Sequence, residues 1–208
     1  MHRVLKRLLA SALDLLFPPR ANERLVRSAT LEQVLALLEP RAIERAGAVA
    51  LLPYRHPIVR ALVKEAKFHD NREAGRLLGA VLAHYLDACI EGPATLVPVP
   101  LSRKRRRERG YNQAERIARH AITYIKEGFS METELLGRIR HTPSQTGLGR
   151  TARLVNVSGA FRARRDCSPE TAYILIDDVT TTGATLMAAR AALQASGSRL
   201  EACLALAH

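Results

Sequence analysis

Apolar residues recur in two patterns along the 208-residue chain. Spacings of three and four positions, which place apolar side chains on one side of a helix, predict helical segments. These segments are residues 4–16, 20–46 with a break at Pro40, 57–90 with a break at 69–71, 112–126 and 184–197. Short apolar runs between glycine, proline or charged residues predict buried strands. These runs are residues 47–55, 95–100, 171–179 and 199–207, with shorter candidates at 135–143 and 158–161.

The alternation of strands and helices after residue 47 predicts an α/β domain with a mostly parallel sheet. We expect this sheet to be twisted and flanked by helices, with residues 47–208 forming one domain. Residues 1–46 carry helical patterns and predict a small helical N-terminal appendage. The apolar face of residues 4–16 fits packing on the rest of the chain better than a membrane surface.

Composition narrows the classes of function. The chain carries 32 Lys and Arg against 20 Asp and Glu, a formal charge of +12, and its hydrophobic fraction of 47% is sufficient for a core. Aromatic residues make up 4% and Trp is absent, so stacking surfaces for nucleic-acid bases are scarce although cations for phosphate are abundant. The charge therefore indicates a phosphate-bearing ligand before it indicates DNA.

No segment predicts export or a membrane span. No apolar run reaches the roughly 18 residues that a transmembrane helix requires. The basic, apolar N-terminus is interrupted by Asp14 and lacks a small-residue cleavage site, which argues against a signal peptide. We therefore expect a soluble, cytoplasmic protein. Its cysteines, Cys89, Cys167 and Cys203, lie far apart and predict neither a zinc site nor a disulfide framework.

The segment ILIDDVTTTGAT at residues 174–185 carries the strongest chemical signal. Asp177 and Asp178 end an apolar strand, and ligands of open α/β sheets bind at the carboxyl ends of strands. The hydroxyls, glycine and helix N-terminus that follow suit a phosphate group. The carboxylates suit the vicinal hydroxyls of a sugar or a metal ion. Helix capping alone explains one such side chain but not the whole cluster.

This segment resembles the phosphoribosyl diphosphate (PRPP) motif of the type I phosphoribosyltransferases. The resemblance implies a type I phosphoribosyltransferase-like fold, in which Asp177 and Asp178 are the catalytic pair and hold the ribose hydroxyls. The 5-phosphate-binding residues that it implies are Thr180, Thr181, Thr182, Gly183, Ala184 and Thr185. It also implies Mg²⁺ bound mainly through PRPP, with no metal site made by side chains alone.

A basic run, RKRRRER at residues 103–109, follows the strand at 95–100 and is expected to be a polar loop. Such a run is typical of a solvated or nucleic-acid-binding face. Directly after a strand end it also suits the pyrophosphate leaving group of PRPP.

Segments 96–115 and 140–161 resemble a narrower group, the competence-associated ComF-like phosphoribosyltransferases. By this resemblance the pyrophosphate-binding residues are Arg105, Arg109 and Arg153. Residues 142–156 resemble the mobile loop that closes over PRPP, with a plain surface connection as the alternative. The segment AKFHDNREAG at 66–75 also resembles this group, and Lys67 is a weaker candidate for a phosphate contact.

The chain departs from the ComF-like pattern at its N-terminus. ComF-like chains typically carry a cysteine-rich zinc module after an LLFPPR-like stretch, but here LLFPPR is followed by Ala21 and Asn22, with no cysteine before Cys89. Without such thiolates the segment cannot build the expected tetrahedral site, and no zinc is expected.

The sequence leaves two classes of function open. The first is a Mg²⁺-dependent phosphoribosyltransferase, a pentosyl-transferring glycosyltransferase that uses PRPP and an acceptor the sequence does not identify, with Tyr111 as a candidate for stacking on an acceptor base. The second is a non-catalytic module that senses PRPP or a nucleotide, or an accessory protein of the DNA-uptake machinery that binds single-stranded DNA. A homodimer is a family-level expectation.

Overall fold

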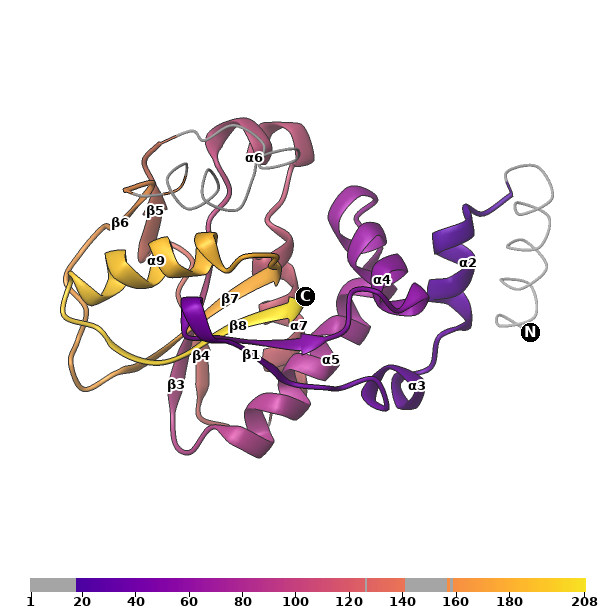
Figure 1. Ribbon diagram of the computed structural model, residues 1–208, viewed down its shortest axis with the longest axis horizontal. Helices are drawn as coiled ribbons and strands as arrows, with labels where there is room; N and C mark the ends of the chain where they lie inside the picture. The colour runs from indigo at the N-terminus through magenta and orange to yellow at the C-terminus, as the bar shows by residue number, and fades with distance from the viewer. Residues whose placement is uncertain (1–17, 126, 141–156, 158) are drawn as a thin grey trace, which may run out of the picture.

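The structure is a computed structural model, which describes residues 18–125, 127–140, 157 and 159–208, without the side chain of residue 45. Its centre is a six-stranded sheet in the order β1-β2-β8-β7-β3-β4 (Figure 1). The strands are β1 (Arg41–Ile43), β2 (Ala48–Leu52), β3 (Ala94–Pro98), β4 (Phe129–Met131), β7 (Ala172–Val179) and β8 (Arg199–Ala207). β1 runs antiparallel to β2, whereas the other neighbouring pairs are parallel. The predicted α/β fold with a mostly parallel sheet is confirmed.

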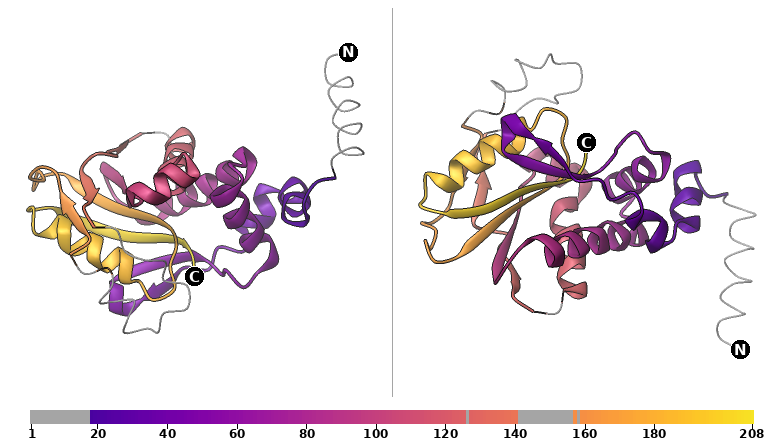
Figure 2. Two further views of the ribbon diagram at one scale, coloured as in Figure 1. Left: turned by 90° about the horizontal axis from the view of Figure 1, so that it is seen from above. Right: turned by 60° about the horizontal axis from the view of Figure 1, so that its bottom comes forward.

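Helices cover both faces of this sheet (Figure 2). α5 (Arg72–Cys89) and α7 (Gln113–Tyr124) pack on each other and on one face, while α9 (Ala184–Gln194) covers the other. A two-stranded sheet of β5 (Leu136–Arg138) and β6 (Phe161–Ala163) adds its apolar residues to the α9 face. In the described ranges no helix is long and apolar enough to cross a membrane.

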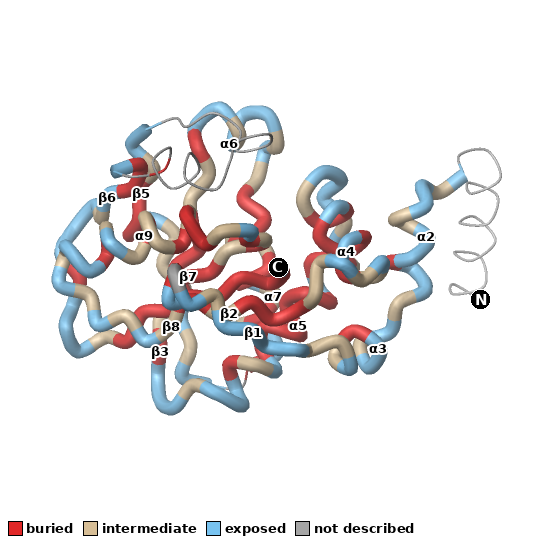
Figure 3. The backbone as a smooth tube through the Cα atoms, viewed as in Figure 1, coloured by how far each residue is buried: buried red, intermediate tan, exposed pale blue. Residues whose placement is uncertain are grey.

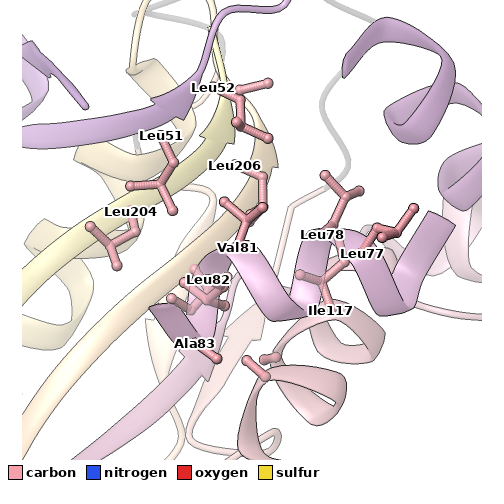
Figure 4. Packing of buried hydrophobic residues seen from close by; sticks show 14 of the residues in the cluster. Leu51, Leu52, Leu77, Leu78, Val81, Leu82, Ala83, Ile117, Leu204 and Leu206 are labelled. Carbon is pink, nitrogen blue, oxygen red and sulfur yellow. The ribbon is translucent and has the colours of Figure 1, made fainter. Parts of the chain in front are cut away.

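The side chains of β7 separate two apolar cores. Successive strand residues point to opposite faces, so Ile174 and Ile176 enter the core under α5 and α7, while Tyr173 and Leu175 enter the core under α9. Figure 4 shows the first core, in which leucines of β2 and β8 face apolar side chains of α5 and α7. Burying each large aliphatic side chain contributes about 1.5–3 kcal/mol, so both layers hold β7 at the centre of the fold.

The described N-terminal segment packs against the main domain. α2 (Ala21–Ser28) and α3 (Leu31–Leu35) place Val26 and Val34 in the same core as α5. Arg20 donates two hydrogen bonds, of 2.8 and 3.3 Å, to Glu65 of α4 (Pro57–Phe68), whose side chain is fully buried. This ion pair fixes the start of α2 on α4. The helix predicted at 4–16 lies outside the described residues.

The helical pattern predicted for residues 20–46 ends before the expected break at Pro40, but the part after this break is wrong. Arg41–Ile43 pairs with β2 as the edge strand of the main sheet. A short 3-10 helix (η1, Glu44–Ala46) and Gly47, with a φ of 53°, close this hairpin. The apolar spacing of a short segment does not reveal whether a neighbouring strand is available for pairing.

The polar loop predicted after β3 is a helix in the structure. α6 (Arg103–Arg109) begins after Ser102, whose hydroxyl accepts a hydrogen bond from the Arg105 N–H at 3.4 Å, and ends at Gly110 with a φ of 78°. A serine cap and a left-handed glycine are ordinary helix boundaries, and the uniform charge of the run obscured them. β4 has no counterpart among the predicted strands, because the alternation of Phe129, Ser130 and Met131 is only three residues long.

Candidate functional site

Asp177 and Asp178 lie near the carboxyl end of β7, one of the two central strands, and with the turn Thr180–Thr185 they form what we call the acid-pair site. Figure 1 shows the carboxyl ends of β7 and β8 pointing toward α4. Being consecutive in a strand, the two carboxylates lean toward opposite faces of the sheet. Asp178 follows the register of Ile174 and Ile176, toward α4 and α7, and Asp177 follows that of Tyr173 and Leu175.

Asp178 is buried and held by side chains from two helices. Its Oδ2 lies 3.2 Å from Nζ of Lys67 in α4 and accepts a 2.8 Å hydrogen bond from Nε2 of Gln113 in α7. Burial alone would raise the pKa of Asp178, but the Lys67 ammonium and the hydrogen bonds from its neighbours lower it below the ordinary value. Asp178 is therefore the ionised member of the pair.

Asp177 is half-buried and has the opposite electrostatic character. Its Oδ1 accepts a 2.9 Å hydrogen bond from the backbone N–H of Asp178. Burial, together with the charge of Asp178, raises the pKa of Asp177 well above that of an ordinary carboxyl group. The pair therefore prefers a single negative charge. Hydrogen bonds donated by a ligand would favour ionisation of Asp177 as well.

The turn after β7 is ordered by its own hydroxyls. The Thr180 N–H donates to the Ala207 carbonyl at 3.0 Å, and Thr180 Oγ1 accepts from the Gly183 N–H at 2.9 Å. His208 Nδ1 lies 3.0 Å from the Thr180 carbonyl oxygen. Gly183, at the N-cap of α9, has no side chain to cap the helix, and the Ala184 N–H donates to Thr182 Oγ1 at 3.4 Å. The first-turn N–H groups of a helix have no intrahelical partner, which suits an anion.

Gly183 also meets a steric requirement. Its φ of 74° is the left-handed conformation, and a Cβ there would lie 2.3 Å from Cβ of Ala46 in η1. The hairpin before β2 thus packs directly against the backbone of the turn. Glycine is needed at this position because any side chain would clash with Ala46, independently of any ligand.

α6 carries cations on two faces. Arg105 and Arg109, one helical turn apart, are half-buried, whereas Arg103, Lys104, Arg106 and Arg107 are exposed. Burial lowers the pKa of Arg109, as does the charge of Arg105, while the charge of Asp178 raises it. Arg105 and Arg109 therefore lie on the acid-pair side of α6, as the sequence had placed them for pyrophosphate.

The exposed face of α6 lines an open cavity of about 1350 Å³ that we call the basic cleft. Its opposite wall is formed by the two-stranded sheet of β5 and β6. Eight cations line the cleft: Arg103, Lys104, Arg106 and Arg107 from α6, and Arg138, Arg140, Arg162 and Arg164 from the β5–β6 side. Two acidic residues, Glu108 and Glu134, accompany them. Figure 3 shows exposed residues along α6, in contrast to the buried β7.

Arg138 connects the basic cleft to the acid-pair site. It lines the cleft from β5, and its guanidinium lies 5.1 Å from the centre of the Phe161 ring. Burial and the charge of Arg105 lower its pKa to about 10, while Asp177 acts in the opposite direction. Its charge therefore acts on both Arg105 and Asp177.

Residues 111–116, which follow α6, hold the turn between α4 and α5 beside the acid-pair site. The Tyr111 hydroxyl donates to the Ala66 carbonyl and accepts from the Asp70 N–H, both at 2.9 Å. The Arg116 guanidinium lies 4.2 Å from the centre of the Tyr111 ring and also pairs with Asp70. Asn112 caps α7 and donates to the Val99 carbonyl at 3.1 Å. Tyr111, the candidate for base stacking, thus has a bonded hydroxyl and one ring face covered.

The structure brings together most of the residues that the sequence selected. The acid pair, the Thr180–Thr185 turn, Arg105 and Arg109 surround the carboxyl end of β7, whereas Arg153 and the loop at 142–156 lie outside the described residues. Sequence reasoning missed Gln113, although it lies in segment 96–115, which resembles the ComF-like group. It also missed Arg138, which belongs to no motif. Across the described parts of the chain, no cluster of three or more His, Cys, Asp and Glu side chains could hold a metal ion.

Comparisons with known proteins agree with the ComF-like resemblance. Competence protein F of Haemophilus influenzae is 33% identical over 96 residues, 45% of this chain and 41% of that protein. DNA utilization protein YhgH of Salmonella typhimurium is 29% identical over 135 residues, 62% of this chain and 58% of that protein. Competence protein ComFC of Bacillus subtilis is 36% identical over 107 residues, 48% of this chain and 38% of that protein.

These matches are partial, since each spans less than two thirds of the relative's own length. No family model matches the chain. The similarity to two competence proteins and a DNA utilization protein nevertheless supports a ComF-like family for this α/β chain.

Proposed function

We propose that the acid-pair site binds the ribose 5-phosphate portion of PRPP. Asp177 and Asp178 accept hydrogen bonds from the ribose hydroxyls, and the Thr180–Thr185 turn receives the 5-phosphate. One observation carries this proposal: a pair of carboxylates at the end of β7 is followed directly by a turn that enters α9 through the left-handed Gly183. Hydroxyl donors satisfy the carboxylates, and N–H groups at a helix N-terminus satisfy a phosphate.

In this proposal the pyrophosphate of PRPP is bound by the cations beside the acid pair. Arg105 and Arg109 on the inner face of α6 supply it with bidentate donors, and Arg138 adds a third cation from β5. Arg153 keeps the role that the resemblance implies. These guanidinium groups stabilise the negative charge that develops as pyrophosphate leaves.

In the proposed transfer, a lone pair of the acceptor forms a bond to C1 of the ribose as the bond from C1 to the pyrophosphate oxygen breaks. Pyrophosphate leaves with the electron pair of that bond, and the proton displaced from the acceptor passes to solvent. The residues of the chain orient the ribose and stabilise charge, and none forms a covalent bond.

Mg²⁺ fits this site as an ion held mainly by PRPP. Lys67 and Gln113 already engage Asp178, so the acid pair offers few carboxylate oxygens for direct ligation. When bound, Mg²⁺ neutralises part of the charge on the pyrophosphate.

The proposal is tested by calorimetric titration of PRPP, with and without Mg²⁺, into the wild type and the Asp177→Asn/Asp178→Asn variant. We expect saturable binding that the double substitution weakens at least a hundredfold, because the ribose hydroxyls lose two acceptors of charge-assisted hydrogen bonds, each contributing about 1.5–3 kcal/mol. Asp87→Asn, an exposed position on α5, is the matched control and should bind normally. A double variant that folds and binds PRPP as the wild type does would refute the assignment.

The names of the relatives favour a second candidate, a role in competence or DNA uptake through binding of single-stranded DNA. The specific observation behind it is the basic cleft, with eight cations against two acidic residues. Neutralising phosphates releases counterions, which makes such binding strongly dependent on salt. In this candidate the acid-pair site serves as a non-catalytic sensor of PRPP or a nucleotide.

Binding of a labelled oligothymidylate at several salt concentrations tests this second candidate. For the triple variant Arg103→Gln/Arg107→Gln/Arg162→Gln we expect weaker binding and a salt slope reduced by about 0.7 for each phosphate that the variant no longer neutralises. Asp177→Asn/Asp178→Asn is the control and should keep its DNA binding. Absence of salt-dependent binding by the wild type would eliminate this candidate and leave PRPP binding untouched.

A further inference from the structure

Gln113 is a buried polar side chain that uses only one end of its amide. It is 4% exposed, and its Nε2 donates the 2.8 Å hydrogen bond to Oδ2 of Asp178. A carboxylate only accepts hydrogen bonds, so Nε2 is the end that faces the acid pair. Oε1 is buried as well, and in the described part of the chain no group donates a hydrogen bond to it. A buried acceptor without a donor destabilises a fold, and folded proteins seldom contain one.

Gln113 also lines a small cavity between α5, α7 and the turn that joins α4 to α5. The volume of this cavity is about 20 Å³, which is enough for one water molecule and too little for a larger ligand. The other polar residues of its wall are Asp70, Asn71, Arg72, Arg116 and His120. A water molecule in the cavity therefore has several polar partners, as buried water requires.

Glycines of α5 form the side of the cavity opposite α7. A Cβ at Gly75 would lie 3.3 Å from Cδ2 and 3.5 Å from Nε2 of His120, so a methyl group there would take up space beside this ring. One helical turn later, a Cβ at Gly79 would lie 2.5 Å from Cβ of His120. Because α5 and α7 are already in close contact at Gly79, the helices cannot approach further to fill the space beside Gly75.

We propose that this cavity holds one water molecule, which donates a hydrogen bond to Oε1 of Gln113 and makes Gln113 the positioning residue of the acid pair. With the water bound, both ends of the amide are paired and the side chain keeps one orientation. Nε2 then holds the Asp178 carboxylate in the orientation in which it meets a ribose hydroxyl. This role in ligand binding rests on the proposed function, whereas the water site does not.

A high-resolution crystal structure of the wild type tests the water site without any ligand. We expect one ordered water molecule within hydrogen-bond distance of Oε1 of Gln113. Gly75→Ala places a methyl group beside His120 and should displace this water, and the variant should fold because alanine favours a helix more than glycine does. A wild-type cavity without water, or an Oε1 paired with another side chain, overturns the inference.

Calorimetric titration of PRPP with Mg²⁺ tests the positioning role. Gln113→Met keeps the length of the side chain but removes both ends of the amide. We expect its affinity for PRPP to fall roughly tenfold, as the loss of one hydrogen bond to a charged group predicts. Gly75→Ala should lose less, because it keeps Nε2. The matched control is Gln194→Met, at an exposed position on α9, which should bind PRPP as the wild type does.

The pH dependence of this affinity separates positioning from a change in packing. Asp178 is acted on by the charges of Lys67 in α4, Arg109 in α6 and Asp177 in β7, and Gln113→Met alters none of them. The Gln113 hydrogen bond lowers the pKa of Asp178, so its loss raises this pKa. On the acid side, PRPP binding should therefore be lost at a higher pH in the variant than in the wild type. Equal affinity, or a lower affinity with an unchanged pH profile, overturns the positioning role.

Failure of this inference is distinguishable from failure of the proposed function. If the wild type binds PRPP and Gln113→Met binds it equally well, the positioning role alone is wrong. If the wild type does not bind PRPP, the proposed function is wrong and the positioning role falls with it. The crystal structure still decides in that case whether the water site exists.

Discussion

The acid-pair site and the basic cleft lie on opposite faces of α6 and handle charge in opposite ways. At the acid-pair site, buried Asp178 is matched by Lys67 and Gln113. In the basic cleft, eight cations, all exposed except the half-buried Arg138, gather with two acids. Burial makes a partner necessary for each charge, whereas water screens like charges that remain exposed. Substitutions in the first region should therefore affect folding strongly, and substitutions in the second should affect mainly the binding of anions.

The largest expected effect is steric and falls at the acid-pair site. Gly183→Ala places a Cβ 2.3 Å from Ala46 in a left-handed conformation. We expect the free energy of unfolding to fall by about 2–4 kcal/mol, from backbone strain and overpacking together. Gly92→Ala is the control, because Gly92 has a φ of 78° with nothing within 4 Å of its Cβ position. Denaturant melts should show a loss of only about 1–2 kcal/mol there.

The next effect comes from adding one charge beside Asp178. Gln113→Glu replaces the donor of a 2.8 Å hydrogen bond by a second carboxylate. We expect a loss of about 1–3 kcal/mol in unfolding free energy. The loss should grow as the pH rises, because burial and Asp178 keep the new carboxyl group protonated at low pH. Gln194→Glu, exposed on α9, should change stability by less than about 0.5 kcal/mol. Equal losses in both variants would remove the contrast between the two regions.

A smaller effect of opposite sign is expected at Asp177. Its pKa in the folded protein is raised by burial, so the folded state loses stability as the pH rises from the ordinary carboxyl range through this raised value. Asp177→Asn avoids that ionisation and keeps an oxygen for the Asp178 N–H. At pH 8 we expect a melting temperature higher by about 2–4 °C, as a change of about 1 kcal/mol produces in a chain of this size. At pH 4 the variant and the wild type should melt together.

The smallest effect on stability is expected in the basic cleft. The Arg103→Gln/Arg107→Gln/Arg162→Gln variant removes three exposed cations from a region of like charge. We expect unfolding free energy to change by less than about 0.5 kcal/mol per position, with less dependence of the melting temperature on salt. A destabilisation of several kcal/mol would mean that the cleft is a structural element of the fold.

The sequence predicted the position of the acid pair but not its partners. An apolar strand that ends in two carboxylates and leads into a helix is a local pattern, and β7 and α9 form as that pattern indicates. Gln113 is 65 positions away from Asp178 in the chain, so its contact depends on how α7 packs on the sheet. Arg138 reaches the site through the pairing of β5 with β6, a register that no local spacing specifies.

The failures of secondary-structure prediction at α6 and β1 have different physical origins. In α6 the signals were local, because Ser102 and Gly110 bound the helix. In β1 they were not, because Arg41–Ile43 is a strand only through its pairing with β2. The first failure is avoidable with attention to capping residues, whereas the second requires knowledge of the tertiary structure.

Ser102 and Gly110 bound α6, and the position of these boundaries sets which face of the helix each cation occupies. Some of the cations therefore face the acid-pair site and others the basic cleft. One residue inserted inside this helix would turn every following side chain by about 100°. Arg109 would then leave the acid-pair side, while composition, net charge and helix propensity stayed almost unchanged. Among homologous chains, the number of residues between this serine and this glycine should therefore vary less than the choice between arginine and lysine at the exposed positions. The length of this helix, more than the choice of arginine or lysine at each position, determines which of its cations face each site.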